Sequence, residues 1–521
     1  MRKYILIICI ITNINVLFAQ DCPNQWGDLG NGTYANPILN ADYSDPDVIR
    51  VGEKYYMVAS DFHFIGMQVL ESEDMVNWKL VSQVYKRFDF PGWDNNTQYA
   101  GGSWAPSIRY HDGYFWIFFC TPKEGLFMTK AKDADGPWSP LVNVMHIEKW
   151  EDPCPFWDED GQAYLGRSIH GAGPIIIHKM SVDGTRLLDE GKVVYTGPVA
   201  EGTKIHKLNG YYYISIPEGG VEKGWQTVLR SKNIYGPYEK KVVLEQGTTA
   251  VNGPHQGAMV DTPQGEWFFF HFQHCNPIGR VMHLQPMYWQ DNWPVVGVDI
   301  DGNGIGEPVK TWKKPNVGKK SAVAVPRTSD DFSSSVLSLQ WQFNHNPVND
   351  AWSLTDKKGS FTLKALKVDN FKLARNTLTQ KSMGYMGMVE TELEYNAMED
   401  GQYCGLACIG KENVLLGICM INGEKWIYMD HNNQISPVLK LSSVKKVYLR
   451  LQLNAIDNAY QFAYSLDNKQ FHLCGNTFSM KFGYWKGVRV GLYCYNTLAD
   501  KGKASFNWFT YQHDGPSCKK Q

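Results

Sequence analysis

The sequence predicts an all-β protein in which a five-bladed β-propeller is followed by a β-sandwich. Three observations lead to this fold class. No stretch keeps an apolar period of 3.6 residues over the length of a helix. A unit of several short strands recurs about every fifty residues up to position 300, which is typical of propellers. From position 330 onwards, short alternating strands separated by turn residues indicate a two-sheet sandwich.

The chain opens with the pattern of a secretory signal peptide at residues 1–19. Arg2 and Lys3 precede an apolar run, Ile5–Ile11, and Ala19 completes a small-residue cleavage pattern. The apolar run is too short to span a bilayer comfortably, and no later segment is apolar enough to do so. We therefore expect an exported protein, periplasmic or secreted, without a transmembrane segment.

Each propeller unit begins with a distinctive residue at the head of a β-hairpin, and a glycine suited to the hairpin turn follows seven to ten positions later. The first unit lies in Asn36–Arg50, where an acidic residue and a proline precede an apolar strand. Because the first strand of each propeller blade lines the central channel, the five heads are expected to converge. They are Asp45, Trp104, Asp152, Glu201 and His255.

The domain boundaries follow from composition. The propeller is predicted to occupy residues 20–310 and the sandwich residues 330–515. Between them, residues 311–329 are rich in Gly, Pro and Lys without any period, which indicates a linker.

Composition restricts the function classes. A net charge of −2 offers no electrostatic basis for binding nucleic acid. Aromatic residues make up 13% of the chain, which suits both sheet packing and stacking against sugar rings. Ten cysteines follow the signal peptide, in no zinc-binding spacing. A disulfide between Cys22 and Cys518 would join the termini, but neither the disulfide pairing nor the oligomeric state follows from the sequence.

Three of the five heads are carboxyls, which is the chemistry that glycosidic bond hydrolysis requires. One carboxyl must protonate the leaving group, and the other must activate water; the two lie roughly 6.5–9.5 Å apart in inverting enzymes. We assign Asp45, from blade one, as the general base and Glu201, from blade four, as the general acid. Asp152, in the adjacent blade, disfavours ionisation of Glu201 and is assigned as the pKa modulator.

The motifs around these heads resemble glycoside hydrolase family 43, of the β-xylosidase / α-L-arabinofuranosidase type. The similar segments include NPILNADYSDPDVIR, SWAPSIRYHDGYFWIFF, EDPCPFWDEDGQAYL and EGTKIHKLNGYYYI. The resemblance covers nearly the whole chain. It implies that the second domain is a jelly-roll, concanavalin A-like sandwich.

The activity that the resemblance implies is exo-acting, inverting release of xylose from β-D-xylosides of xylan or xylo-oligosaccharides. An α-L-arabinofuranosidase trimming arabinoxylan or arabinan is the alternative, and a galactose-type exo-glycosidase is a more distant one. A non-catalytic carbohydrate-binding protein is also a distant alternative, against which the presence of all three acids argues. The expected partner is a plant cell-wall oligosaccharide or polysaccharide.

The resemblance also implies residues that contact the sugar. Its motifs assign this role to Arg280, His255 and Glu218, and the aromatic contacts to Phe64 and Trp104. No cofactor is required, although a structural calcium ion is expected near His255, reached through water. A sandwich loop at Phe482–Arg489 is a candidate for closing the pocket, through Tyr484, Trp485 or Arg489.

Overall fold

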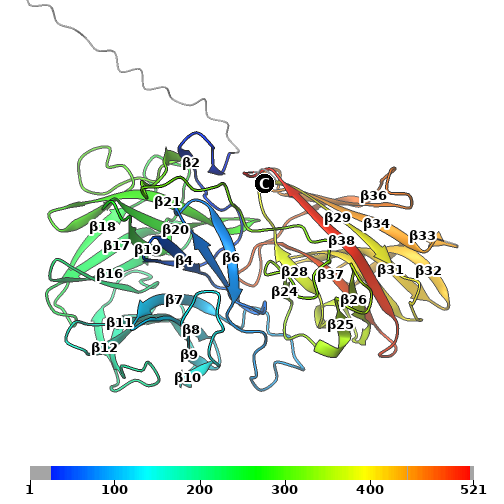
Figure 1. Cartoon of the computed structure of the whole chain (residues 1–521), viewed down its shortest axis with the longest axis horizontal. Coiled ribbons are helices and arrows are strands. Elements are labelled where there is room, and N and C mark those ends of the chain that lie inside the picture. Colours follow the sequence, from blue (N-terminus) through cyan, green and yellow to red (C-terminus); the bar gives the residue numbers. More distant parts are fainter. Residues whose placement is uncertain (1–24, 443, 517–521) are drawn as a thin grey trace, which may run out of the picture.

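The computed structural model describes residues 25–442 and 444–516, so the predicted signal peptide, Cys22 and Cys518 lie outside the described residues. Two lobes lie side by side, the first built by the blue-to-green half of the chain and the second by the yellow-to-red half (Figure 1). The described residues form strands, turns and two short 3-10 helices, η1 (Asn349–Ala351) and η2 (Phe371–Leu373). The prediction of an all-β fold is confirmed.

The first lobe contains five antiparallel four-stranded sheets that follow one another in sequence order. Blades one and two comprise β3 (Asp47–Val51), β4 (Lys54–Val58), β5 (Gln68–Ser72), β6 (Trp78–Gln83), β7 (Trp104–His111), β8 (Tyr114–Thr121), β9 (Gly125–Ala131) and β10 (Val142–Met145). Blades three to five comprise β11 (Trp150–Trp157), β12 (Ala163–Ile169), β13 (Ile175–Met180), β14 (Lys192–Tyr195), β15 (Lys204–Leu208), β16 (Tyr211–Glu218), β17 (Trp225–Ser231), β18 (Glu239–Leu244), β19 (His255–Asp261), β20 (Trp267–Cys275), β21 (Gly279–Gln290) and β22 (Trp293–Val296).

The first strand of each blade faces the centre of this lobe. Strand β3 contacts β7 and β19, and β11 contacts β7 and β15, so these four pairs of neighbouring blades meet through their first strands, while blade four meets β19 through β16 and β17. The glycines predicted for the inner hairpin turns have φ between 61° and 84°, a left-handed conformation that glycine adopts without strain. They are Gly52, Gly113, Gly161, Gly210 and Gly265.

The segment before blade one pairs with blade five and so connects the first and last blades of the propeller. Leu39 pairs with Met282 of blade five, and the side chain of Asn36 donates to the carbonyl of Leu284. The start of the predicted linker also belongs to this lobe. There β23 (Thr311–Lys313) pairs with β2 (Thr33–Ala35), which in turn pairs with β1 (Gly27–Asp28).

The second lobe is a sandwich of an eight-stranded and a seven-stranded sheet. The first contains β24 (Gln342–Phe343), β27 (Leu366–Lys367), β28 (Leu378–Lys381), β30 (Gln402–Ile409), β31 (Asn413–Ile421), β32 (Glu424–His431), β33 (Gln434–Leu441) and β37 (Arg489–Asn496). The second contains β25 (Trp352–Ser353), β26 (Phe361–Lys364), β29 (Met386–Glu394), β34 (Lys446–Asn454), β35 (Ala459–Ser465), β36 (His472–Ser479) and β38 (Lys503–His513).

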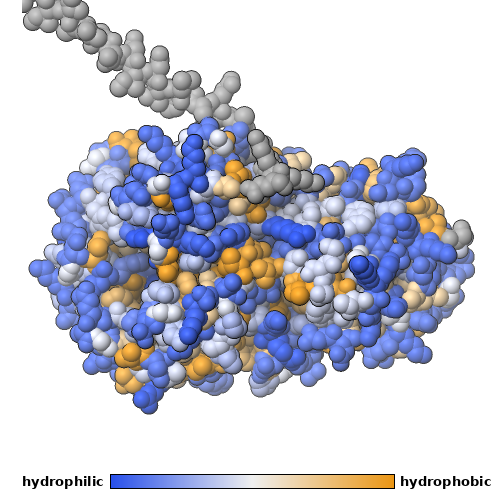
Figure 2. Space-filling view, viewed as in Figure 1, coloured by the Kyte–Doolittle hydropathy of each residue, from blue (hydrophilic) through white to orange (hydrophobic). Residues whose placement is uncertain are grey.

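The two lobes share buried contacts. One apolar cluster contains Trp78 and Phe270 of the propeller together with Phe332 and Trp341 of the sandwich. Figure 2 shows a largely hydrophilic surface on which hydrophobic residues gather where the lobes meet. Buried ion pairs also cross this boundary, such as Lys381 Nζ to Asp61 Oδ1 at 2.6 Å. The sandwich is therefore close enough to the propeller to contribute to its centre. In the described part of the chain, none of the helices has the length and apolar character needed to span a membrane.

Candidate active site

A cavity of about 310 Å³ opens at the centre of the propeller. All five predicted head residues line it, although they come from five different blades. One residue of the sandwich also reaches it. The lining residues are Asp45, Phe62, Trp104, Ala105, Glu151, Asp152, His170, Gly171, Glu201, Val221, His255, Gln256, Arg280 and Trp485.

The backbone corrects one detail of the repeat pattern, because the heads occupy two neighbouring positions rather than one. Every blade has a left-handed residue at the start of its inner strand: Asp45, Ala105, Asp152, Gly202 and Gln256, with φ of 38° to 64°. In blades two, three and five, a register shift in the inner ladder accompanies this residue, as in a β-bulge. Asp45 and Asp152 are themselves left-handed, whereas the other three heads precede the left-handed residue. The counterpart of Glu201 in blade three is therefore Glu151.

Asp45 lies in a cationic environment. Its Oδ1 pairs with a guanidinium nitrogen of Arg280 at 2.9 Å, and its Oδ2 accepts from the hydroxyls of Ser60 at 2.6 Å and Ser44 at 2.8 Å. Burial raises the pKa of Asp45, but the charge of Arg280 and the two hydroxyl hydrogen bonds outweigh that effect and hold the pKa below its ordinary value. The carboxylate is therefore ionised and held in one orientation.

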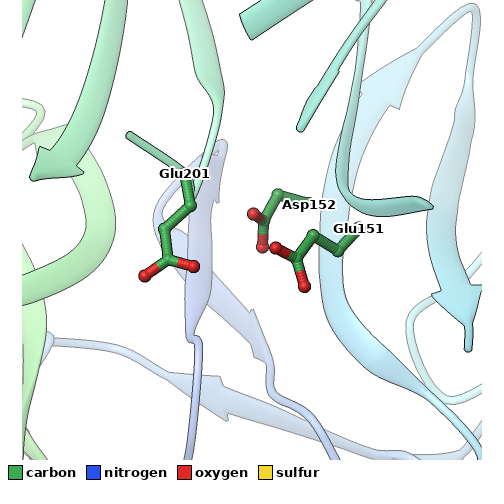
Figure 3. Close-up of side chains that lie close together, drawn as sticks. All are labelled: Glu151, Asp152 and Glu201. Atoms are coloured by element: carbon green, nitrogen blue, oxygen red, sulfur yellow. The ribbon is translucent and has the colours of Figure 1, made fainter. Parts of the chain in front are cut away.

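Three further carboxyls, those of Glu151, Asp152 and Glu201, crowd together on the side of blades three and four (Figure 3). Each offers an oxygen within 4.8 Å of the others. Burial and then the charge of Glu201 raise the pKa of Asp152 to about 6, although Ser168 and the amide of Gly202 donate to its Oδ2. Burial and the charges of Asp152 and Glu201 raise the pKa of Glu151 to about 9. Like charges at this spacing favour retention of protons.

Glu201 is the most accessible of the four acids, because its side chain is 21% exposed. Its Oε1 lies 2.9 Å from Nε2 of His255, whose side chain is only 2% exposed. His255 packs its ring near Phe272. A buried imidazole thus orients a carboxyl that still reaches the cavity.

Two residues predicted to contact the sugar lie elsewhere. Glu218 is fully buried and accepts hydrogen bonds from Tyr195 at 2.7 Å and Thr227 at 2.6 Å, while Lys240 pairs with it at 2.9 Å. The prediction that Glu218 contacts the sugar is therefore wrong. It follows Glu201 closely along the chain, but the side chain of Glu218 meets Tyr195 of blade three and Thr227 and Lys240 of its own blade, and these partners satisfy it.

The prediction that Phe64 contacts the sugar is also wrong. It is 2% exposed, and its ring lies 3.9 Å from the guanidinium carbon of Arg489. Arg489 is itself buried under that ring and does not cover the pocket. Phe62, two positions earlier, lines the cavity instead. The two phenylalanines belong to the same short aromatic segment, and the sequence offers no signal that separates them.

The sequence also missed Glu151, His170 and Gln256. Gln256 donates to Asp152 Oδ1 at 3.1 Å, and Nδ1 of His170 lies 3.3 Å from Glu151 Oε2. For Glu151 a signal existed, because the sequence has two consecutive acids before Pro153 where the first blade has one. His170 follows the second strand of blade three, and only the folded chain brings it to the cavity.

A tight hairpin of the sandwich supplies the remaining wall. Gly483 and Lys486 exchange two backbone hydrogen bonds of 3.0 Å, and Tyr484 and Trp485 between them have φ of 57° and 64°, as in a type I′ turn. Trp485 is 43% exposed, and its ring centre lies 5.9 Å from the guanidinium of Arg280. Tyr484 packs against Tyr99 instead. Of the three residues considered for closing the pocket, Trp485 is the one that lines it.

Lys486, the next residue of this hairpin, links the sandwich to the surroundings of Asp45. Nζ of Lys486 donates to the carbonyl of Ser60 at 2.7 Å, and the hydroxyl of Ser60 donates to Asp45. Lys486 is almost fully buried. The second lobe therefore contributes both an aromatic wall and a support for the residue that orients Asp45.

Comparison with known proteins accounts for both lobes. The sequence profile of the glycosyl hydrolases family 43 matches residues 34–294, and that of the β-xylosidase C-terminal concanavalin A-like domain matches residues 329–512. The chain is 56% identical over 476 residues to a putative β-xylosidase of Xylanibacter ruminicola, covering 91% of this chain and 88% of that protein.

Two further comparisons agree. A β-xylosidase of Formosa agariphila is 40% identical over 558 residues, covering 95% of this chain and 93% of that protein. The crystal structure of a family 43 protein of Bacillus licheniformis is similar with a TM-score of 0.80 at 26% identity, covering 92% of this chain and 99% of that one. The similarity therefore extends over both lobes and their arrangement.

Proposed function

The chain belongs to glycosyl hydrolase family 43 and is a glycosidase, and from this premise we propose that it is an exo-acting, inverting enzyme that releases xylose from β-D-xylosides of xylan or xylo-oligosaccharides. The observation that carries the proposal is the contrast between the acids of one cavity. Asp45 is kept ionised by Arg280 and two hydroxyls, whereas Glu201 lies within 4.8 Å of two further carboxyls. A base and an acid with opposite environments are what hydrolysis with inversion requires.

In the proposed reaction, Asp45 removes a proton from a water molecule whose oxygen attacks the anomeric carbon. The bond from that carbon to the glycosidic oxygen breaks, and Glu201 gives its proton to the departing oxygen. The products are the released sugar and a shortened chain with a free hydroxyl. Asp45 then carries the proton that Glu201 lost, and exchange with solvent restores both groups before the next turnover.

Exo action is supported by the shape of the cavity. Its walls include Phe62, Trp104 and, from the sandwich, Trp485. Aromatic walls on several sides of a cavity of about 310 Å³ leave room for the end of a chain rather than for its middle. Arg280, whose guanidinium is already oriented by Asp45, offers further donors to sugar hydroxyls.

Xylose is proposed as the released sugar because the two relatives described above, at 56% and 40% identity, carry the name β-xylosidase. An α-L-arabinofuranosidase would use the same acids with a differently shaped sugar. The expected polymer is a plant cell-wall xylan. Export from the cytoplasm is proposed from residues 1–19 alone, and determining the N-terminal residue of the mature protein from its native host tests it.

The experiment that tests the proposal compares rates on 4-nitrophenyl β-D-xyloside and 4-nitrophenyl α-L-arabinofuranoside, with Glu201→Gln alongside. We expect the xyloside rate to dominate. Glu201→Gln should nearly abolish hydrolysis of xylobiose, whose leaving group needs a proton, and should affect the activated aryl xyloside much less. An equal loss on both substrates contradicts the assignment of the acid, and a dominant arabinofuranoside rate contradicts the assignment of the sugar.

No cofactor is needed for this reaction, because the two carboxyls carry out both proton transfers. The calcium ion expected near His255 stays a prediction. In its favour, Nδ1 of His255 is buried without a hydrogen-bond partner among the described residues, and a water molecule bound to a cation would satisfy it. Calorimetric titration of the chelator-treated protein with calcium tests this prediction, and a flat titration contradicts it.

A further inference from the structure

Glu151 is a carboxyl of the cavity for which the proposed reaction has no use. It lies in β11 directly before Asp152, at the position that Glu201 holds in blade four. It is 7% exposed and lines the cavity. A buried acid beside two others costs free energy unless something compensates for it. We therefore expect Glu151 to have a partner that compensates for this cost.

The two oxygens of Glu151 differ in their contacts. Oε2 lies 3.3 Å from Nδ1 of His170, whose ring also packs against Trp104 with centroids 5.0 Å apart. Oε1 is buried and has no hydrogen-bond partner among the described residues. One oxygen is thus held by His170, while the other is a buried polar atom of a side chain that lines the cavity.

The charges around Glu151 influence whether its carboxyl carries a proton. Asp152 on the same strand, Glu201 from blade four and Asp45 from blade one all raise its pKa after burial itself, and the backbone amide of Ala172 is a smaller opposing influence. No lysine or arginine pairs with it among the described residues. These surroundings favour the protonated form of Glu151, and a protonated carboxyl is both a hydrogen-bond donor and an acceptor.

We propose that Glu151 is a specificity-determining residue whose carboxyl, oriented by His170, hydrogen-bonds one hydroxyl group of the sugar. The inference rests on the proposed function, because it takes a glycoside as the ligand. A hydroxyl group both donates and accepts, so it matches a neutral carboxyl and leaves neither partner unsatisfied. A substrate lacking that hydroxyl would leave a buried polar group unpaired, which is the strongest form of hydrogen-bond discrimination.

The experiment measures kcat/KM of the wild type, Glu151→Leu and Glu151→Gln on 4-nitrophenyl β-D-xyloside and on its 2-, 3- and 4-deoxy analogues. For each analogue, the ratio of its rate to that of the parent is compared between wild type and variant, which cancels the intrinsic reactivity of the analogue. We expect one analogue to be discriminated against about 10- to 100-fold more strongly by the wild type than by Glu151→Leu. The other two analogues should behave alike in both enzymes and serve as internal controls.

Glu151→Gln separates hydrogen bonding from packing. Its amide donates and accepts in nearly the same volume, so it should keep most of the discrimination that Glu151→Leu loses. Thermal melting identifies a variant that fails to fold. If Glu151→Leu does not fold, Glu151→Gln alone provides the test, through its rate ratios on the deoxy analogues and through separate measurements of KM and kcat.

Two results would overturn the inference. If Glu151→Leu lowers the rates on the parent and all three analogues by one common factor, Glu151 acts on structure or charge and not on a hydroxyl. If Glu151→Gln loses discrimination as fully as the Leu variant, the neutral carboxyl is not what the sugar contacts. A wild type that hydrolyses only the arabinofuranoside would contradict the xylose assignment alone, and the same hydroxyl-deletion series on that glycoside would then decide the role of Glu151.

Discussion

Asp45 and Glu151 are both buried carboxyls of one cavity, yet their surroundings are opposite. Asp45 faces the guanidinium of Arg280 and two hydroxyls. Glu151 faces Asp152 and Glu201, and its nearest basic partner is the imidazole of His170 at 3.3 Å. We call the first group, Asp45 with Arg280, the base wall, and the second, Glu151, Asp152 and Glu201, the acid wall.

The comparison shows that burial alone does not decide the charge of a carboxyl. Burial is the largest influence on both groups, and it raises the pKa of each. The base wall reverses that effect with a cation, and the acid wall reinforces it with anions. Charge partners therefore assign the roles of base and acid, and exchanging those partners should exchange the properties.

The largest effect is expected from removing the ionised carboxyl of the base wall. Asp45→Asn cannot accept the proton of the attacking water, so kcat should fall about 10²–10⁴-fold on aryl xylosides and xylobiose alike. The matched control is Asp47→Asn, which alters a buried carboxylate that pairs with Arg109 at 2.6 Å and does not line the cavity. A near-normal rate of Asp45→Asn would mean that the base lies elsewhere.

The second prediction removes the cation of the base wall. In Arg280→Met, burial still raises the pKa of Asp45, but the positive charge that mainly opposes this effect is gone. The pKa of Asp45 should therefore rise. Because the base works in its ionised form, activity is lost as pH falls through that pKa, and the acid limb of the pH–rate profile should move up by about 1–3 pH units. The profile of kcat/KM measures it. An acid limb that stays in place would show that Arg280 does not control the base.

The third prediction removes one carboxylate from the acid wall. Asp152→Asn removes a negative charge within 4.8 Å of Glu201, the proposed acid, with little change in side-chain volume. Because the acid works in its protonated form, the basic limb of the pH–rate profile should move down by about one pH unit. The acid limb, which belongs to Asp45, should change little and is the internal control. Movement of the acid limb alone would contradict the separation of the two walls.

The smallest effect is expected outside both walls. Trp485→Ala removes an aromatic surface of the sandwich without changing any charge, so KM for xylobiose should rise about 2- to 10-fold with an unchanged pH profile. Trp312→Ala is the matched control, because Trp312 is similarly exposed, at 37%, and does not line the cavity. A shifted pH profile in Trp485→Ala would show that the sandwich hairpin also governs the walls.

Prediction from the sequence succeeded where signals were local and repeated. The five hairpin glycines and the recurring strands predicted five blades, and the structure contains five four-stranded sheets in that order. The convergence of Asp45, Asp152 and Glu201 followed from that symmetry without any contact being known. The pattern placed them at one repeat position, whereas Asp45 and Asp152 occupy the left-handed position itself and Glu201 the position before it. The sequence did not reveal this offset, because a single left-handed residue leaves no clear mark in it.

Prediction failed where neighbours in the chain diverge in space. Glu218 lies near Glu201 in sequence, yet its side chain points between blades and is satisfied by Tyr195, Thr227 and Lys240. Phe62 and Phe64 are two positions apart, and one lines the cavity while the other packs on Arg489 of the second lobe. Side-chain direction is set by contacts between blades for Glu218 and by packing across the lobe boundary for Phe64.

The sequence by itself determined the architecture, the family and the presence of acids at the centre, since turn residues, alternation and repeat length act over a few neighbouring residues. Only the tertiary structure decided which acid is charged. Asp45 meets Arg280 across 235 positions of sequence, and Glu151 meets Glu201 from another blade. Electrostatic effects depend on distance in space and on exclusion of water, so the charge of each carboxyl exists only once the blades and the sandwich hairpin have come together.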